Sequence, residues 1–210
     1  MERPALPVHT RLLYSCSSLG SEALTQSRGA WLLYFYAPPR SADLHRLLPL
    51  GLAGALISIN GVIGALYNPI ISYWSDRTRS RLGRRLPYIV LATPLWALFA
   101  LLLFTPPRSG TAVTAAYLVA VLELGSVFST LSGGPFQALL PEVARSSAER
   151  VSVVGMRTYF GAAGGGVGLV AGGLLVDHLG FRAMALVMAG FALGCRYIAT
   201  AGVWRRADRT

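Results

Sequence analysis

Long apolar stretches separated by short polar connectors dominate this sequence. A helix that crosses the hydrocarbon core of a bilayer needs about 20 mostly apolar residues, and six stretches reach that length. They cover residues 12–37, 48–75, 87–106, 111–138, 151–176 and 183–204, and the first is the least hydrophobic. The pattern predicts an all-α fold, a polytopic bundle of six membrane-spanning helices.

Proline and glycine mark the connections between these spans. The breaks fall at Pro38-Pro39, Pro106-Pro107, Pro141 and Gly180. Backbone that leaves the helical conformation cannot face lipid, because its polar groups would lose their hydrogen bonds. The four breaks are therefore predicted to be water-exposed turns.

Charge is scarce, and it is mostly positive. Charged residues make up 13% of the chain and hydrophobic residues 53%, whereas soluble domains carry about 25% charged residues. All 19 basic residues are arginines and the net charge is +10. A basic chain can bind nucleic acid, but these arginines lie between apolar runs rather than on one soluble face. The composition predicts lipid, and not nucleic acid, as the partner.

The arginines also predict an orientation, because cytoplasmic connectors accumulate them. If both termini lie inside, the inner segments hold Arg3, Arg11, Arg77, Arg79, Arg81, Arg84, Arg85, Arg145, Arg150, Arg205, Arg206 and Arg209. The outer loops then hold only Arg40, Arg46, Arg108 and Arg182. The prediction is a multi-pass protein of the cell membrane: residues 1–11 form a cytoplasmic N-terminus, 12–204 the bundle and 205–210 the start of a central cytoplasmic loop.

A weak internal repeat divides the spans into two units of three. Span two is followed by Asp76 and by Gly-Arg-Arg at residues 83–85, and span five by Asp177 and by Gly-Phe-Arg at residues 180–182. The two copies would lie on opposite membrane faces. Inverted three-helix repeats of this kind are typical of transporter halves.

Residues that could support catalysis or metal binding do not cluster. Cys16 and Cys195 lie in apolar segments at opposite ends of the chain, without disulfide or metal spacing. His9, His45 and His178 are scattered singly, and no paired-acid motif accompanies them. The sequence therefore predicts neither an enzyme nor a cofactor or metal site.

The connector after span two is distinctive. Residues 76–88 read D-R-T-R-S-R-L-G-R-R-L-P-Y and follow an Asn68-Pro69 pair. This closely resembles the loop between helices two and three of the glycoside–pentoside–hexuronide:cation symporters, a branch of the major facilitator superfamily that includes the melibiose carriers. The resemblance continues through Tyr34-Phe35-Tyr36, residues 135–142 and Arg157. Because a full member has twelve helices, it implies that this chain corresponds to the amino-terminal six-helix half and that the carboxy-terminal half is missing.

In that family the aspartate and arginines of this loop latch the cytoplasmic gate. The resemblance implies a gating role for Asp76, Arg77, Arg81, Gly83, Arg84 and Arg85. Arginines after a helix end also offset its negative dipole and bind its free carbonyls. Plain anchoring by positive charge is a compatible alternative. The family usually has glycine where this chain has Ser72, which is still small.

A polar stripe on span one and an arginine on span five predict the solute site. Ser15, Ser18, Glu22 and Gln26 recur at spacings of three and four, so they share one helical face. Glu22 stands where related sugar symporters have an acidic residue that contacts substrate, and Arg157 matches a family arginine near the sugar site. The alternatives are a carboxyl paired for packing and a snorkelling anchor. The substrate-binding candidates are Glu22, Gln26, Tyr67, Asn68, Gln137 and Arg157.

Two further patterns concern spans four and five. Glu123 and Gln137 are nearly four turns apart and share a face of span four, where Gly133 and Gly134 are expected to loosen the helix before Pro135. In span five the small-residue ridge predicts close helix packing. It consists of Gly161, Gly164, Gly165, Gly168 and Gly172. Arg28 and Arg196 also lie within spans.

Members of this family couple transport to sodium or to protons, and the residues of this chain favour the proton. Sodium-coupled members carry carboxylates at positions that correspond to Gly64, Asn68 and Gly133 here, and a sodium ion usually needs carboxylate oxygens. The resemblance therefore favours proton coupling through Glu22 or Glu123, or uncoupled transport.

The function predicted overall is secondary active transport of a sugar or glycoside. The site would lie between this half and a second six-helix half, so the chain alone is expected to be inactive. The alternative is a non-transporting membrane regulator or assembly factor on the same scaffold.

Overall fold

The computed structural model describes residues 7–42, 44–77, 86–107, 109–144 and 146–207. Across these ranges the chain forms helices and no strand. The helices are α1 (Val8–Tyr36), α2 (Leu50–Arg77), α3 (Leu86–Leu102), α4 (Thr111–Ala138), α5 (Leu140–Val143), α6 (Ser147–Leu179) and α7 (Phe181–Ala207). The all-α fold is confirmed, and the six predicted spans correspond to the six long helices.

The helix bounds differ from the predicted spans where local chemistry decides them. The fourth span has the bounds of α4, but α6 begins at Ser147 rather than at 151. Ser146 and Glu149 form a capping box there: the Ser146 side chain accepts from the Glu149 amide at 3.1 Å, and the Glu149 carboxylate accepts from the Ser146 amide at 3.4 Å. Gly180, with φ 84°, ends α6 as predicted. Because the capping box satisfies the backbone amides of both Ser146 and Glu149, α6 begins one turn earlier than the hydropathy pattern indicates.

Two expectations about proline are wrong. Pro141 does not lie in an irregular turn, because it falls in the first turn of the short helix α5, where a missing amide proton costs nothing. Likewise α4 runs unbroken through Gly133, Gly134 and Pro135. A proline inside a helix removes one hydrogen bond to the preceding turn, and here that loss does not end the helix.

Four helices are long and apolar enough to cross a membrane. Within the described residues these are Leu50–Ile71 of α2, α4, α6 and Phe181–Gly202 of α7. The apolar part of α3, Pro87–Leu102, is shorter, and α1 is the helix that carries the polar stripe. The chain is a multi-pass membrane protein built as a helix bundle.

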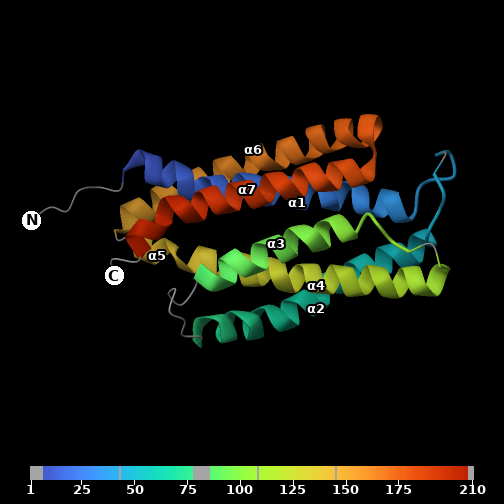
Figure 1. The fold of residues 1–210 in the computed structure, drawn as a ribbon, viewed down its shortest axis with the longest axis horizontal. Helices are drawn as coiled ribbons and strands as arrows, with labels where there is room; N and C mark the ends of the chain where they lie inside the picture. Colours follow the sequence, from blue (N-terminus) through green and yellow to red (C-terminus); the bar gives the residue numbers. More distant parts are fainter. Residues whose placement is uncertain (1–6, 43, 78–85, 108, 145, 208–210) are drawn as a thin grey trace, which may run out of the picture.

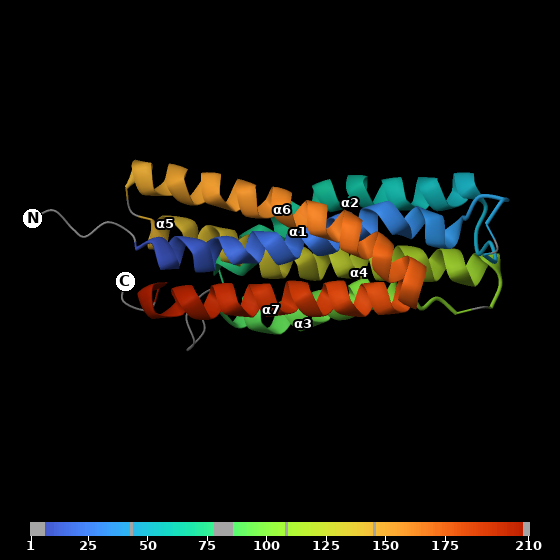
Figure 2. The same cartoon turned by 90° about the horizontal axis from the view of Figure 1, so that it is seen from above.

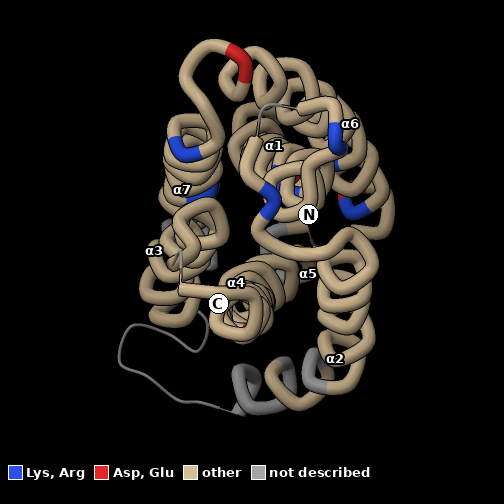
Figure 3. The backbone as a smooth tube through the Cα atoms, turned by 90° about the vertical axis from the view of Figure 1, so that its right-hand side faces the viewer, with Lys and Arg blue, Asp and Glu red and all other residues tan. Residues whose placement is uncertain are grey.

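The helices form two groups that meet along α3 (Figures 1 and 2). One group is α1 with α6 and α7, and the other is α4 with α3 and α2; α3 also packs against α7. Helix α1 begins and α7 ends at the end of the bundle where α5 lies, while the α1–α2 and α6–α7 connections lie at the opposite end. Figure 3, which views the bundle end-on, shows that most of the backbone carries no charged residue.

Helix α6 packs onto α1 backbone to backbone. A Cβ atom added at Gly164 or Gly168 would overlap the carbonyl oxygen of Leu19 or Ala23, and one at Gly172 would lie 3.2 Å from Cβ of Ser27. The partners advance by four residues on both helices, so α1 and α6 run parallel in a fixed register. This contact agrees with the packing role predicted for the ridge, since helices in lipid associate through small residues.

The packing also joins the two ends of the sequence. A Cβ atom at Gly20 of α1 would lie 2.7 Å from Cβ of Cys195 in α7. Cys16, one turn earlier on α1, lies on the same side of the helix near Cys195, and both are free thiols. Residues that the sequence places far apart thus meet across the α1–α7 contact.

Candidate solute-binding groove

A groove of about 640 Å³ runs between α1 and α6. Polar residues of α1 and small residues of α6 form most of its lining. The lining residues are Ser18, Glu22, Gln26, Val154, Arg157, Thr158, Gly161, Ala162, Gly165, Gly166 and Leu169. Three of the predicted substrate-binding residues, Glu22, Gln26 and Arg157, therefore share one groove.

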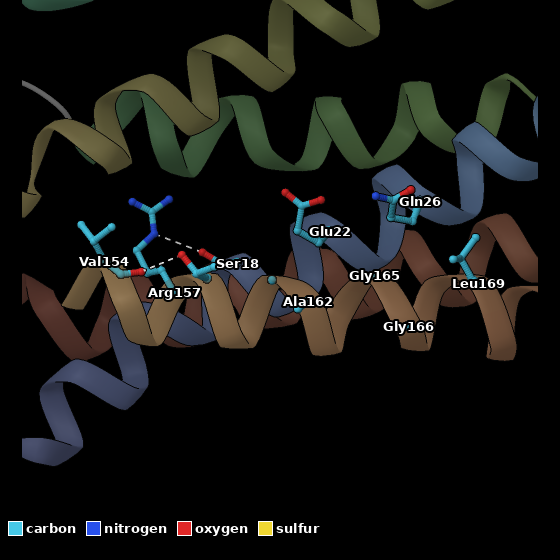
Figure 4. A pocket seen from close by; sticks show the side chains of 11 residues that line it. Ser18, Glu22, Gln26, Val154, Arg157, Ala162, Gly165, Gly166 and Leu169 are labelled. Carbon is cyan, nitrogen blue, oxygen red and sulfur yellow. Dashed lines mark hydrogen bonds between the residues drawn. The ribbon is translucent and has the colours of Figure 1, made fainter. Parts of the chain in front are cut away.

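The register between the two helices creates this lining. Arg157 is level with Ser18, Gly161 with Glu22 and Gly165 with Gln26. A Cβ atom at Gly161 would lie 3.3 Å from Cγ of Glu22, and one at Gly165 would lie 3.4 Å from Cγ of Gln26. Each glycine thus leaves room for a polar side chain of α1, and Figure 4 shows Arg157, Glu22 and Gln26 projecting from the α1–α6 pair on the same side.

Arg157 is anchored at one end of the groove. Its Nε donates a hydrogen bond to the Ser18 hydroxyl at 3.1 Å, drawn as a dashed line in Figure 4. Its guanidinium carbon also lies 5.5 Å from the centre of the Tyr14 ring, within the range of a cation–π contact. Two fixed contacts hold the planar group, and its outer nitrogens project away from α6.

Glu22 lies one helical turn further along the groove. The side chain is half-buried, and no ion pair joins it to Arg157 among the described side chains. A guanidinium and a carboxylate one turn apart offer donors at one position and acceptors at the next. Gln26 adds an amide, with both donor and acceptor, another turn along. Such a row suits a ligand with several hydroxyl groups, because each hydroxyl both donates and accepts.

Two other predicted residues lie outside this groove. Gln137 is exposed near the end of α4 and is not among the lining residues. Glu123 is half-buried on α4, and its Oε2 is buried without a hydrogen-bond partner among the described atoms. Helical spacing places Glu123, Thr130 and Gln137 on one face of α4. The predicted residues of α4 are therefore not among those that line the groove between α1 and α6.

The remaining candidates stay predictions. Tyr67 and Asn68 lie within α2 and Asp76 and Arg77 in its last turn, but their side chains are not described. Arg81, Gly83, Arg84 and Arg85 lie outside the described residues.

Sequence reasoning missed two polar contacts deeper in the bundle. Asn60 of α2 donates to Ser126 of α4 at 3.1 Å. Arg196 of α7 is 6% exposed and donates to the Ser21 hydroxyl at 3.0 Å. A charge within an apolar span was the signal for Arg196, but its partners lie far away in the sequence.

Residues 13–210 match the family model described as MFS/sugar transport protein. The chain belongs to this family. The match confirms the resemblance to the glycoside–pentoside–hexuronide:cation symporters of the major facilitator superfamily, which rested on the residue 76–88 motif.

Several curated relatives in this family are symporters or sugar transporters. An uncharacterized symporter of Synechocystis sp. is 29% identical over 167 residues, which cover 77% of this chain and 30% of that protein. An isoprimeverose transporter of Lactiplantibacillus pentosus is 24% identical over 210 residues, 96% of this chain and 43% of that protein. Proton-associated sugar transporter A of Homo sapiens is 34% identical over 149 residues, 64% of this chain and 20% of that protein. The chain spans less than half the length of these relatives.

Proposed function

We propose that this chain forms one half of a secondary active transporter for a sugar or glycoside, and that the groove between α1 and α6 supplies part of its solute site. The observation that carries the proposal is the placement of Arg157, Glu22 and Gln26 in one groove. A guanidinium can bind two hydroxyls through parallel hydrogen bonds, and a carboxylate accepts from others. Isoprimeverose, named for one relative, is a ligand of that relative.

Binding measurements test this proposal directly. The chain in lipid nanodiscs is titrated with a panel of pentoses, hexoses, disaccharides and simple glycosides, and bound sugar is followed by saturation-transfer NMR. At least one sugar is expected to bind, and Arg157→Gln or Glu22→Gln is expected to weaken it at least about tenfold, the loss typical of a hydrogen bond to a charged group. Thr25→Ala is the matched control, since Thr25 is exposed on α1 beside Gln26 but does not line the groove.

Failure of every sugar to bind, or equal binding by Arg157→Gln, would argue against the groove as a sugar site. The non-transporting regulator would then be the better interpretation.

We further propose that transport needs a second six-helix half and is driven by protons rather than sodium. The lengths of the relatives support the first point. The second is supported by the absence of carboxylates at Gly64, Asn68 and Gly133 and by the name of the human relative. Glu22 and Glu123 are the proposed proton sites.

Proteoliposomes test both points. The chain is reconstituted alone and together with the carboxy-terminal half of a related symporter, and uptake of the bound sugar is measured with a pH gradient or a sodium gradient. Uptake is expected only with both halves and only with the pH gradient. A strict sodium requirement would overturn the coupling proposal, and uptake by the chain alone would overturn the need for a second half.

The gate and the orientation are proposed on the same family basis. In the two-half carrier, Asp76→Asn is expected to slow uptake while membrane insertion stays normal, because the arginines that follow would lose an ionised partner. Labelling of Ser80→Cys in intact cells checks the orientation. The engineered thiol is expected to react only with membrane-permeant maleimide; reaction with an impermeant reagent would place this connector outside the cell.

A further inference from the structure

Arg196 is a charged side chain enclosed in the bundle. It extends from α7 toward α1, α3 and α4, where its guanidinium carbon lies 4.9 Å from the Phe136 ring centre and 5.9 Å from that of Trp96. One outer nitrogen donates to Ser21, while Nε is buried and unpartnered among the described atoms. No carboxylate of the described side chains pairs with it. A buried charge without a counter-ion is costly unless other groups stabilise it, and here the Ser21 hydroxyl and the rings of Phe136 and Trp96 contact the guanidinium.

The rings beside Arg196 lead to the groove. Phe136 of α4 is stacked on Tyr14 of α1 with ring centres 4.8 Å apart and planes 14° apart. The Tyr14 hydroxyl donates to the Phe136 carbonyl at 3.0 Å, and both side chains are fully buried. Arg157 lies over the Tyr14 ring. These contacts form a continuous stack that joins four helices and is named here the arginine–aromatic column. It consists of Arg196 of α7, Phe136 of α4, Tyr14 of α1 and Arg157 of α6.

We infer that Arg196 is a positioning residue for the groove, acting on Arg157 through the arginine–aromatic column. Its guanidinium attracts the face of the Phe136 ring and holds that ring against Tyr14. Tyr14 in turn presents the face on which Arg157 rests. Arg157 is thus held by two contacts: its hydrogen bond to Ser18 and its position over the Tyr14 ring of the column. The inference rests on the proposed function only in that Arg157 is the residue that contacts the solute.

A thiol placed beside Arg157 reports its position without any solute. The sequence contains two cysteines, so Cys16→Ala and Cys195→Ala give a cysteine-free chain, into which Ser18→Cys is introduced. Because Ser18 accepts from Arg157, a sulfur there faces the guanidinium, which favours the reactive thiolate. The alkylation rate by a small maleimide at fixed pH, in detergent, then measures how close the guanidinium is.

The column predicts a definite pattern of rates. Arg157→Gln should slow alkylation about tenfold, the effect of removing one nearby charge. Arg196→Gln and Phe136→Leu should each slow it several-fold. Their combination should be no slower than either alone, because residues that act through one path are not additive. Arg196→Lys, which keeps the charge but not the planar face, should give an intermediate rate.

Tyr197→Phe is the matched control. It removes the hydrogen bond from the Tyr197 hydroxyl to the Val90 carbonyl, a tie between α7 and α3 next to Arg196 that does not touch the column. Its rate should equal that of the parent. Thermal unfolding of every variant is measured alongside, and if Arg196→Gln does not fold, Arg196→Lys and Phe136→Leu carry the test.

Two results would overturn the inference: an unchanged rate in the folded Arg196 and Phe136 variants, or effects of the two that add. Sugar binding to the same variants separates this inference from the proposed function. Changed alkylation without any sugar binding would support the column and reject the solute site. Sugar binding with an unchanged alkylation rate would support the solute site and reject the column.

Discussion

Two rows of glycine run along α6, and they have opposite consequences. Gly164 and Gly168 face the backbone of α1, where no side chain would fit, and Gly172 continues this row against the side chain of Ser27. Gly161 and Gly165 face the side chains of Glu22 and Gln26, which they leave room for. The first row brings two helices together, and the second keeps a space open beside them.

The difference shows that the groove depends on the packing. The register set by the first row is what places each glycine of the second row opposite a polar residue of α1. A change in the first row should therefore disturb the whole fold, whereas a change in the second should disturb the groove alone. Substitutions can separate these two cases.

Gly168→Val should have the largest effect. The new side chain would collide with the Ala23 carbonyl, and since backbone rather than a flexible side chain opposes it, the helices must separate. Overpacking of this kind should cost about 3 kcal/mol, the upper end of the usual range. Thermal unfolding in detergent, followed by size-exclusion chromatography, measures the loss. A folded variant with the parent's melting temperature would contradict the backbone contact between α1 and α6.

The double substitution Gly161→Ala and Gly165→Ala should have an intermediate effect that is confined to the groove. The methyl at residue 161 would lie 3.3 Å from Cγ of Glu22, which must shift slightly, and the methyl at residue 165 would lie 3.4 Å from Cγ of Gln26 and fill the space beside it. We expect sugar affinity to fall about tenfold, or about 1.4 kcal/mol. Calorimetric titration gives the affinity, and the melting temperature should not fall, because alanine favours a helix more than glycine does. A parallel loss of stability would show that this row packs like the first.

Ser18→Ala should have a smaller effect at the same site. It removes the acceptor of the Arg157 Nε hydrogen bond, a loss of about 1 kcal/mol. Arg157 would keep its contact with Tyr14, so sugar affinity should fall only about fivefold. The same titration checks this, and a loss as large as that of Arg157→Gln would mean that Ser18 itself binds the sugar.

Gly166→Ala should have the smallest effect of all. Gly166 lines the groove, yet a Cβ atom there meets nothing within 4 Å. Affinity should stay at the parent's value, and stability should stay equal or rise by up to about 1 kcal/mol through helix propensity. A clear loss of binding would show that the sugar itself reaches this side of α6.

The sequence predicted the long helices because run length alone identifies a membrane span. It misplaced the start of α6, although the Ser146 and Glu149 capping box was readable as a local motif. The short helix α5 contains too few residues for any periodic signal. The predicted third span ran to residue 106, but α3 ends at Leu102 because the residues that follow form turns. These residues are still apolar, so the hydropathy pattern does not distinguish them from the helix.

The site was predictable where it depends on one helix and hidden where it depends on two. The stripe of Ser18, Glu22 and Gln26 follows from helical spacing alone. That Gly161 and Gly165 face this stripe depends on the register between α1 and α6, which no local pattern contains. The stacking of Arg196 on Phe136 likewise joins residues 60 positions apart.

The parallel contact of α1 and α6 also bears on how this half can move. Helices whose backbones touch at two successive turns behave as one rigid body, since sliding either would drive carbonyl oxygens into the neighbouring chain. Helix α2 is held differently, mainly by α4, with the Asn60–Ser126 pair between them and much of its surface exposed. Within this half, α2 is therefore the helix that can be displaced at the lowest energetic cost. A solute bound to α1 and α6 would contact a rigid surface, while the nearby α2 remains free to move.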